Sequence, residues 1–92
     1  MTFQRAEGRE RGKIVLYALS TCMWCRMTKQ LLKEQGVAYA FVDVDLLDSS
    51  EKEEARREVR RWNPSGSYPT LVIDDCTVVS GYDEAEIRQK LA

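Results

Sequence analysis

One segment limits the fold more than any other part of this chain: a strand, a helix and a second strand follow one another between residues 14 and 44. The run Ile14 to Tyr17 is continuously apolar and rich in β-branched residues, which is typical of a strand covered on both faces. The stretch up to Gln35 contains neither Gly nor Pro, and Gly36 can adopt the left-handed conformation that ends a helix. With the segment Tyr39 to Val44, the pattern predicts a βαβ unit and therefore an α/β protein.

The second half of the chain adds a helix, a hairpin and a last helix. A serine and a glutamate at residues 50–53 have the capping-box spacing, and the helix that they open ends before Asn63-Pro64. Two apolar segments, 70–73 and 77–79, flank a short polar turn and predict a β-hairpin. An aspartate and a glutamate at residues 83–86 form another capping box, so the predicted order is β-α-β-α-β-β-α.

Length and composition restrict the number of domains and the class of partner. The 92 residues are enough for one domain, which we place at residues 13–92, because chains separate into several cores only beyond roughly 250 residues. Residues 1–12 carry little apolar surface and should form a flexible tail. The formal charge of −1 does not favour nucleic acid or an anionic membrane as a partner. No segment resembles a membrane helix or a secretory signal, so we expect a cytoplasmic protein.

The number and spacing of the cysteines limit the kinds of chemistry that this chain can carry out. The chain has three cysteines and no histidine, and an odd number of cysteines argues against a disulfide scaffold. Two of the three form the motif Cys22-Met23-Trp24-Cys25 at the start of the first predicted helix. In a reducing compartment, such a pair indicates either metal binding or redox catalysis.

The position of the cysteine pair predicts a different role for each sulfur. If Cys22 caps the helix and Cys25 lies in its first turn, both sulfurs lie on one side of the helix start, within reach of a disulfide. Unpaired N–H groups and the positive end of the helix macrodipole then favour the thiolate of Cys22, so we predict that Cys22 is the nucleophile. Cys25, shielded by the helix, would resolve the mixed disulfide formed on Cys22.

Other uses of the pair remain as alternatives. A structural zinc site needs four ligands, and only Cys76 is left beyond the pair, so no resident metal is expected. Two chains could instead bridge an iron–sulfur cluster, each donating Cys22. A further alternative is an adaptor without redox activity that uses the same fold for protein contact, in which Cys22 would be an ordinary thiol.

Three short motifs occur in a fixed order along the chain. They are Cys22-Met23-Trp24-Cys25 after the first strand, Tyr68-Pro69-Thr70 at the opening of a later strand, and Ser80-Gly81-Tyr82-Asp83 at the opening of the last helix. With these motifs, residues 13–92 resemble the thioredoxin superfamily and, within it, the glutaredoxin-like branch. The resemblance implies a thioredoxin fold with a central four-stranded mixed sheet, helices on both faces, and a cis peptide bond before Pro69 that faces the cysteine pair.

The resemblance also implies a substrate-binding surface around the pair. The implied binding residues are Tyr68, Pro69, Gly81, Tyr82 and Asp83, and the position of Trp24 between the two cysteines adds it as a binding residue. The main chain of Tyr68 would pair with an extended substrate. The N–H groups from Gly81 to Asp83 would bind a carboxylate such as that of a glutathione-like tripeptide, and Asp83 can also act as an N-cap alone. Trp24 would pack against a substrate or cover the end of the helix.

This chain departs from the usual glutaredoxin pattern near the cysteines. Glutaredoxins usually have Pro and Tyr between the two cysteines, where this chain has Met23 and Trp24, so the redox potential is expected to be its own. They also usually carry a basic residue three positions before the first cysteine to contact the glutathione carboxylate, and here that residue is Leu19. The segment Ser80-Gly81-Tyr82 resembles the corresponding segment of small redoxins that are reduced by a thioredoxin-type reductase.

These observations together predict a monomeric dithiol thiol-disulfide oxidoreductase that reduces protein or low-molecular-weight disulfides. No bound cofactor is expected. The electrons would come from glutathione or another thiol, or from an NADPH-linked flavoprotein reductase, and the partners would be disulfide-containing proteins.

Overall fold

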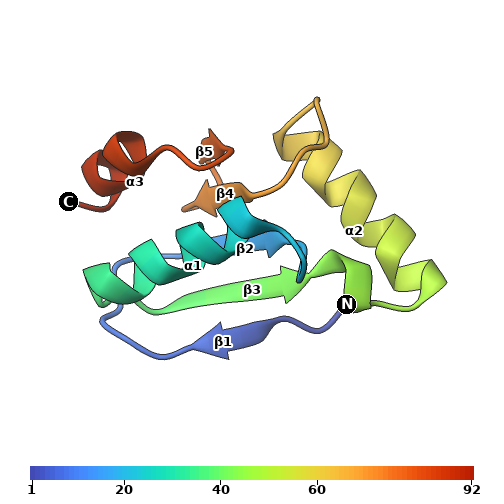
Figure 1. Ribbon diagram of the computed structural model, residues 1–92, viewed down its shortest axis with the longest axis horizontal. Helices are drawn as coiled ribbons and strands as arrows, with labels where there is room; N and C mark the ends of the chain where they lie inside the picture. The colour runs from blue at the N-terminus through green and yellow to red at the C-terminus, as the bar shows by residue number, and fades with distance from the viewer.

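The computed structural model describes residues 1–92, with five strands and three α-helices (Figure 1). The strands are β1 (Gln4–Ala6), β2 (Ile14–Ala18), β3 (Tyr39–Asp43), β4 (Thr70–Ile73) and β5 (Thr77–Ser80). The helices are α1 (Met23–Gln35), α2 (Ser49–Trp62) and α3 (Glu84–Leu91), and a short 3-10 helix, η1 (Val44–Leu46), follows β3. None of these helices combines the length and the apolar composition that crossing a membrane requires.

The strands form one mixed sheet in the order β1-β3-β2-β4-β5, with β2 at its centre. β2 is parallel to β3, as the predicted βαβ unit requires, and it is antiparallel to β4. β4 pairs antiparallel with β5, as the predicted hairpin requires. The expected count of four strands is wrong by one, because Gln4–Ala6 pair antiparallel with β3. Part of the segment expected to be a flexible tail therefore belongs to the sheet, and Arg9 forms a further bridge with Val37.

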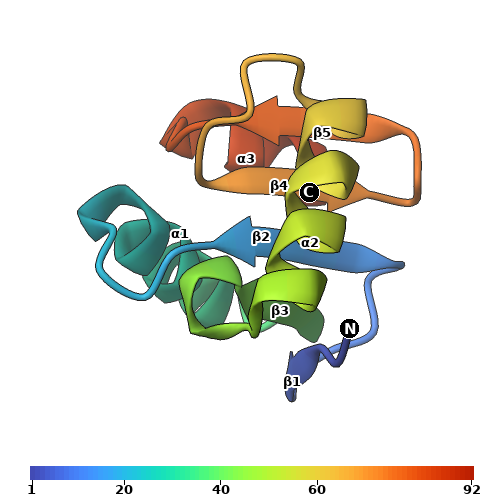
Figure 2. The same cartoon turned by 90° about the vertical axis from the view of Figure 1, so that its right-hand side faces the viewer.

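Side chains that alternate along β2 divide the interior into two apolar clusters. Leu16 lies in the larger cluster, which also contains Leu32 of α1 and Ile87 of α3. The next residue, Tyr17, points to the opposite face and packs in a smaller cluster with Val59 of α2. Figure 2 shows α1 and α3 on one face of the sheet and α2 on the other. The thioredoxin fold with helices on both faces is therefore confirmed, with one additional strand at the edge.

Capping residues set the helix boundaries. α1 ends at Gly36, whose φ of 71° lies in the left-handed region, as the sequence predicted. α2 is capped by Asp48, which accepts the N–H of Glu51, rather than by Ser50. An ionised carboxylate is as effective an N-cap as a hydroxyl group, and it also interacts favourably with the positive end of the helix macrodipole. α3 has the predicted cap, Asp83.

Candidate redox site

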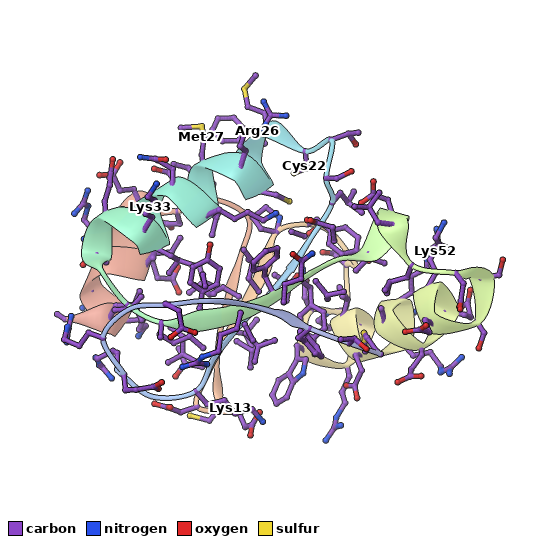
Figure 3. All side chains as sticks on the ribbon, turned by 90° about the horizontal axis from the view of Figure 1, so that it is seen from below. Lys13, Cys22, Arg26, Met27, Lys33 and Lys52 are labelled. Carbon is purple, nitrogen blue, oxygen red and sulfur yellow. The ribbon has the colours of Figure 1, made fainter.

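Cys22 lies at the junction between the central strand and the first helix (Figure 3). Its N–H donates to the carbonyl of Leu19 at 3.2 Å, which closes the turn after β2. Its Sγ accepts the N–H of Cys25 at 3.1 Å, so Cys22 is the N-cap of α1. The N–H groups of Met23 and Trp24 donate to no backbone carbonyl and add to the positive potential at this helix end. The half-buried sulfur therefore occupies a place that favours negative charge.

Cys25 lies on the inner side of α1. Its side chain is fully buried in the larger apolar cluster. Burial raises the pKa of the Cys25 thiol to about 12, and the hydrogen bond to Cys22 acts in the same direction. The two sulfurs thus differ, since one is reachable and the other is buried and protonated at neutral pH. All three cysteines are unpaired, and no group of three or more His, Cys, Asp or Glu side chains is arranged to hold a metal ion.

The turn that carries Cys22 is held by a carboxylate that sequence reasoning missed. Oδ1 of Asp45 accepts the N–H of Ser20 at 2.7 Å, and Oδ2 accepts the Ser20 hydroxyl. These hydrogen bonds hold the pKa of Asp45 below its ordinary value, the one from the hydroxyl contributing most. Asp45 lies in η1, directly after β3, and β3 is the parallel neighbour of β2. The only signal in the sequence was the presence of aspartates just after the second predicted strand.

The loop before β4 brings Tyr68 and Pro69 to the end of the sheet at which β2 leads into α1. The peptide bond between them is cis, as the resemblance implied. The main-chain groups of Tyr68 form no backbone hydrogen bond, while its side chain packs against the cluster that contains Cys25. Because its N–H and carbonyl are unused, Tyr68 can pair with an extended peptide that approaches the cysteines.

Asn63 organises this loop from the end of α2, and the sequence had indicated only a helix stop at this residue. Its side chain is buried and its Nδ2 donates to the hydroxyls of Ser67 and Thr70, both at 3.1 Å. Its Oδ1 accepts the hydroxyl of Ser65 at 2.8 Å. A buried amide whose donors and acceptor are all satisfied stabilises one loop conformation, and that conformation places Tyr68.

An exposed apolar surface adjoins the start of α1. Trp24, which is 56% exposed, stacks on Tyr82 with ring centroids 5.9 Å apart. Met23 and Met27 on the same helix are also exposed. We call these four residues the apolar rim. A stacked aromatic pair with one ring largely open to solvent can serve as a contact surface for a substrate.

The start of α3 offers fewer free donors than the resemblance implied. The N–H of Gly81 donates to the carbonyl of Pro69 at 2.8 Å and is therefore already used. The N–H groups of Tyr82 and Asp83 donate to no backbone carbonyl. The Asp83 side chain caps α3 by accepting the N–H of Glu86 at 3.1 Å. Two N–H groups rather than three thus remain at this helix start.

Cys76 lies at the end of the sheet opposite the cysteine pair. It is exposed in the turn between β4 and β5. Its neighbour Asp75 pairs with Lys13 at 2.9 Å, and Figure 3 shows Lys13 on the side of the molecule opposite Cys22. The fold therefore brings together Cys22, Cys25 and the loop at Tyr68, and it leaves Cys76 apart.

A mixed sheet with a Cys-x-x-Cys pair at the start of α1 and a cis-proline loop at the same end defines the thioredoxin-fold dithiol proteins. The family model described as glutaredoxin matches residues 14–78. The chain belongs to the glutaredoxin family.

Three similar proteins illustrate this membership. The chain is 48% identical to a glutaredoxin from Methanosarcina mazei Go1, with a TM-score of 0.90 over 98% of this chain and 87% of that one. It is 48% identical to Methanosarcina acetivorans methanoredoxin, with a TM-score of 0.90 over 92% of this chain and 90% of that one. It is also 34% identical over 74 residues to an uncharacterized glutaredoxin-like 8.6 kDa protein in the rubredoxin operon of Clostridium pasteurianum, which covers 80% of this chain and 91% of the relative.

Proposed function

We propose that the protein is a dithiol thiol-disulfide oxidoreductase that reduces protein or low-molecular-weight disulfides through Cys22 and Cys25. The contrast between the two sulfurs carries this proposal. Cys22 is half-buried and accepts an N–H at a helix start, whereas Cys25 is fully buried behind it with a raised pKa. A nucleophile must be reachable and ionised, while a resolving thiol must stay protonated until the mixed disulfide has formed.

In the first step, the Cys22 thiolate attacks one sulfur of the substrate disulfide. A bond forms between Cys22 Sγ and that sulfur, the substrate S–S bond breaks, and the second substrate sulfur leaves as a thiolate. The substrate lies against the unused main chain of Tyr68 and beside Pro69, and its apolar side chains contact Trp24 and Tyr82. A substrate carboxylate is bound by the free N–H groups of Tyr82 and Asp83.

In the second step, Cys25 attacks Cys22 Sγ of the mixed disulfide. Burial raises the pKa of Cys25 most, and the hydrogen bond with Cys22 and the charge on Cys22 raise it further in the free protein. The contributions of Cys22 end when Cys22 becomes covalently bound, so the pKa of Cys25 falls at the moment when its proton must leave. The proton goes to the departing substrate thiolate, and the products are the Cys22–Cys25 disulfide and the reduced substrate.

The internal disulfide is reopened by glutathione or another thiol, or by an NADPH-linked flavoprotein reductase. Leu19 offers no charge for a glutathione carboxylate three positions before Cys22. We therefore expect turnover with a thioredoxin-type reductase to be faster than turnover with glutathione. The proposal includes a monomeric protein that works in the cytoplasm.

Two cysteine variants test this function. Both are made in a Cys76→Ser background, so that no third thiol reacts with the substrate disulfide. Cys22→Ser should abolish NADPH-linked reduction of an insulin-type protein disulfide, because no nucleophile is left. Cys25→Ser should still attack but should accumulate a mixed disulfide with the substrate, visible by intact-mass spectrometry. Full activity of the Cys22→Ser variant, or its appearance as the trapped species, would contradict the assignment of the nucleophile.

A further inference from the structure

A groove runs along the side of α1, between this helix and β1. It has a volume of about 360 Å³. Arg26, Lys29 and Lys33 line it from the helix, at spacings of three and four residues that place them on one face. Val37 and Tyr39, both buried, contribute apolar surface. The groove therefore combines an apolar surface with a basic wall.

Two of the three cations in this wall have no carboxylate partner. Lys29 pairs with Asp43 at 2.8 Å and lies 4.5 Å above the ring of Phe41, so its charge is already balanced. Arg26 and Lys33 form no ion pair and are exposed. The acid that lines the groove, Glu7, lies 3.5 Å from Arg5 of β1, which also pairs with Glu10. The wall thus presents two unbalanced positive charges in a protein whose net charge is −1.

The groove begins beside the redox pair. Arg26 directly follows Cys25, and Figure 3 shows Arg26 near the end of α1 that carries Cys22, with Lys33 at the far end of the same helix. Seven residues of helix separate the two cations by about 10 Å, a length that about three residues of extended peptide span. A short segment that lies along the groove can therefore belong to a molecule whose disulfide reaches Cys22.

We propose that this groove, formed by Arg26, Lys33 and the apolar surface at Tyr39, is a docking site for an acidic extended segment of a disulfide-bearing protein substrate. The inference rests on the proposed function and names the chemistry of its partner. Charge complementarity selects the occupant: carboxylates pair with Arg26 and Lys33, and an apolar side chain between them contacts Tyr39. The groove lies along the side of α1, and the residues that line it belong neither to the apolar rim nor to the loop at Tyr68.

Two peptides of equal length test the docking site. Each carries one cysteine as a mixed disulfide with a chromogenic thiol, followed by about four glutamates in one peptide and as many glutamines in the other. The wild-type protein should reduce the glutamate peptide with a kcat/KM about five-fold higher at low salt, the effect expected of two partly exposed ion pairs. The double variant Arg26→Gln/Lys33→Gln should reduce both peptides equally.

The matched control is Arg57→Gln/Lys90→Gln, which removes two exposed cations on α2 and α3 that form no ion pair. This control should keep the wild-type preference. Equal rates for both peptides with the wild-type protein would overturn the docking site and leave the proposed function intact. Equal loss of the preference in both double variants would also overturn it, because net charge alone would then explain the effect.

A binding measurement separates the docking site from the redox chemistry. A cysteine-free glutamate peptide is titrated into the Cys22→Ser protein and followed by chemical shifts of backbone amides. Shifts should concentrate on α1 and β1 and should vanish in the Arg26→Gln/Lys33→Gln background. If neither peptide were reduced while these shifts appeared, the proposed function would fail and the docking site would stand. An absence of shifts would overturn the docking site.

Discussion

Asp45 links the stability of the redox site to pH. Its carboxylate accepts two hydrogen bonds from Ser20, and these lower its pKa in the folded chain. A carboxylate whose pKa is lower in the folded than in the unfolded state stabilises the fold at every pH above its unfolded value, and this contribution disappears as the pH falls through the folded value. Since the ordinary value is 3.8, the contribution of Asp45 is complete at neutral pH and is lost only in more acidic solution.

Asp45→Asn should lower the free energy of unfolding at neutral pH by about 1 kcal/mol, because an amide oxygen accepts a weaker hydrogen bond than a carboxylate. The difference from the wild type should begin to shrink below about pH 4, where the carboxyl group becomes protonated in the unfolded chain, and should disappear as the pH falls through the lower folded value. Urea titrations over a series of pH values measure this difference. Glu54→Gln removes an exposed carboxylate that forms no ion pair and serves as the control. A difference that persisted unchanged into strong acid would contradict the role of Asp45.

Residues whose partners lie within one helical turn could be predicted from the sequence. The caps at Cys22 and Asp83 depend on contacts three residues away, which a local pattern contains. Asp45 could not be predicted, because Ser20 lies 25 residues away and the two meet only through the parallel pairing of β2 and β3. For Asn63 the sequence indicates only a helix stop, because the role of its side chain depends on how the following loop folds back on it.

Among the elements, the N-terminal segment and the last helix are joined by one side chain. The Nε of Arg11 donates to the carbonyl of Leu91 at 3.1 Å, and its Nη2 donates to the carbonyls of Lys90 and Ala92 at 3.2 and 3.1 Å. The last carbonyls of a helix lack partners within the helix and carry the negative end of its macrodipole. A guanidinium in this position therefore satisfies these acceptors and holds the end of α3.

Arg11→Ala should lower the free energy of unfolding by about 1 kcal/mol and speed amide hydrogen exchange in α3 more than in α2. Hydrogen exchange followed by mass spectrometry resolves the two helices. Arg9→Ala is the matched control, since the side chain of Arg9 forms no ion pair while its main chain bonds to Gly36 and Ala38. Equal exchange in α3 of the two variants would show that the guanidinium does not hold this helix.

Elements with clear apolar periodicity could be predicted, and those without it could not. β2 to β5 and all three helices have buried faces that the sequence pattern contains. β1 was missed because Gln4–Ala6 bond through the main chain at the sheet edge, with two exposed side chains and no apolar alternation. The cap of α2 was misplaced because Asp48 and Ser50 both fit the pattern, which cannot rank two neighbouring caps.

For the whole molecule, residues 1–12 cover one edge of the sheet and complete the smaller apolar cluster. β1 pairs with β3, which would otherwise be an edge strand. The ring of Phe3 packs edge-to-face on Tyr17, with centroids 5.8 Å apart. The redox site itself is built from residues 19–83. We therefore propose that residues 13–92 contain the complete redox site and that residues 1–12 stabilise it.

Removal of residues 1–12 should lower the free energy of unfolding by about 2–4 kcal/mol, because β1 pairing, the Phe3 contact and the Arg11 hydrogen bonds are all lost. Disulfide reduction should persist at temperatures where the shortened chain is folded. The newly exposed edge of β3 should pair with other molecules, so sedimentation velocity should show association that grows with concentration. The Arg11→Ala variant keeps β1 and should sediment as the full chain does. A shortened chain as stable and as monodisperse as the full one would show that the N-terminal strand neither stabilises the sheet nor protects its edge.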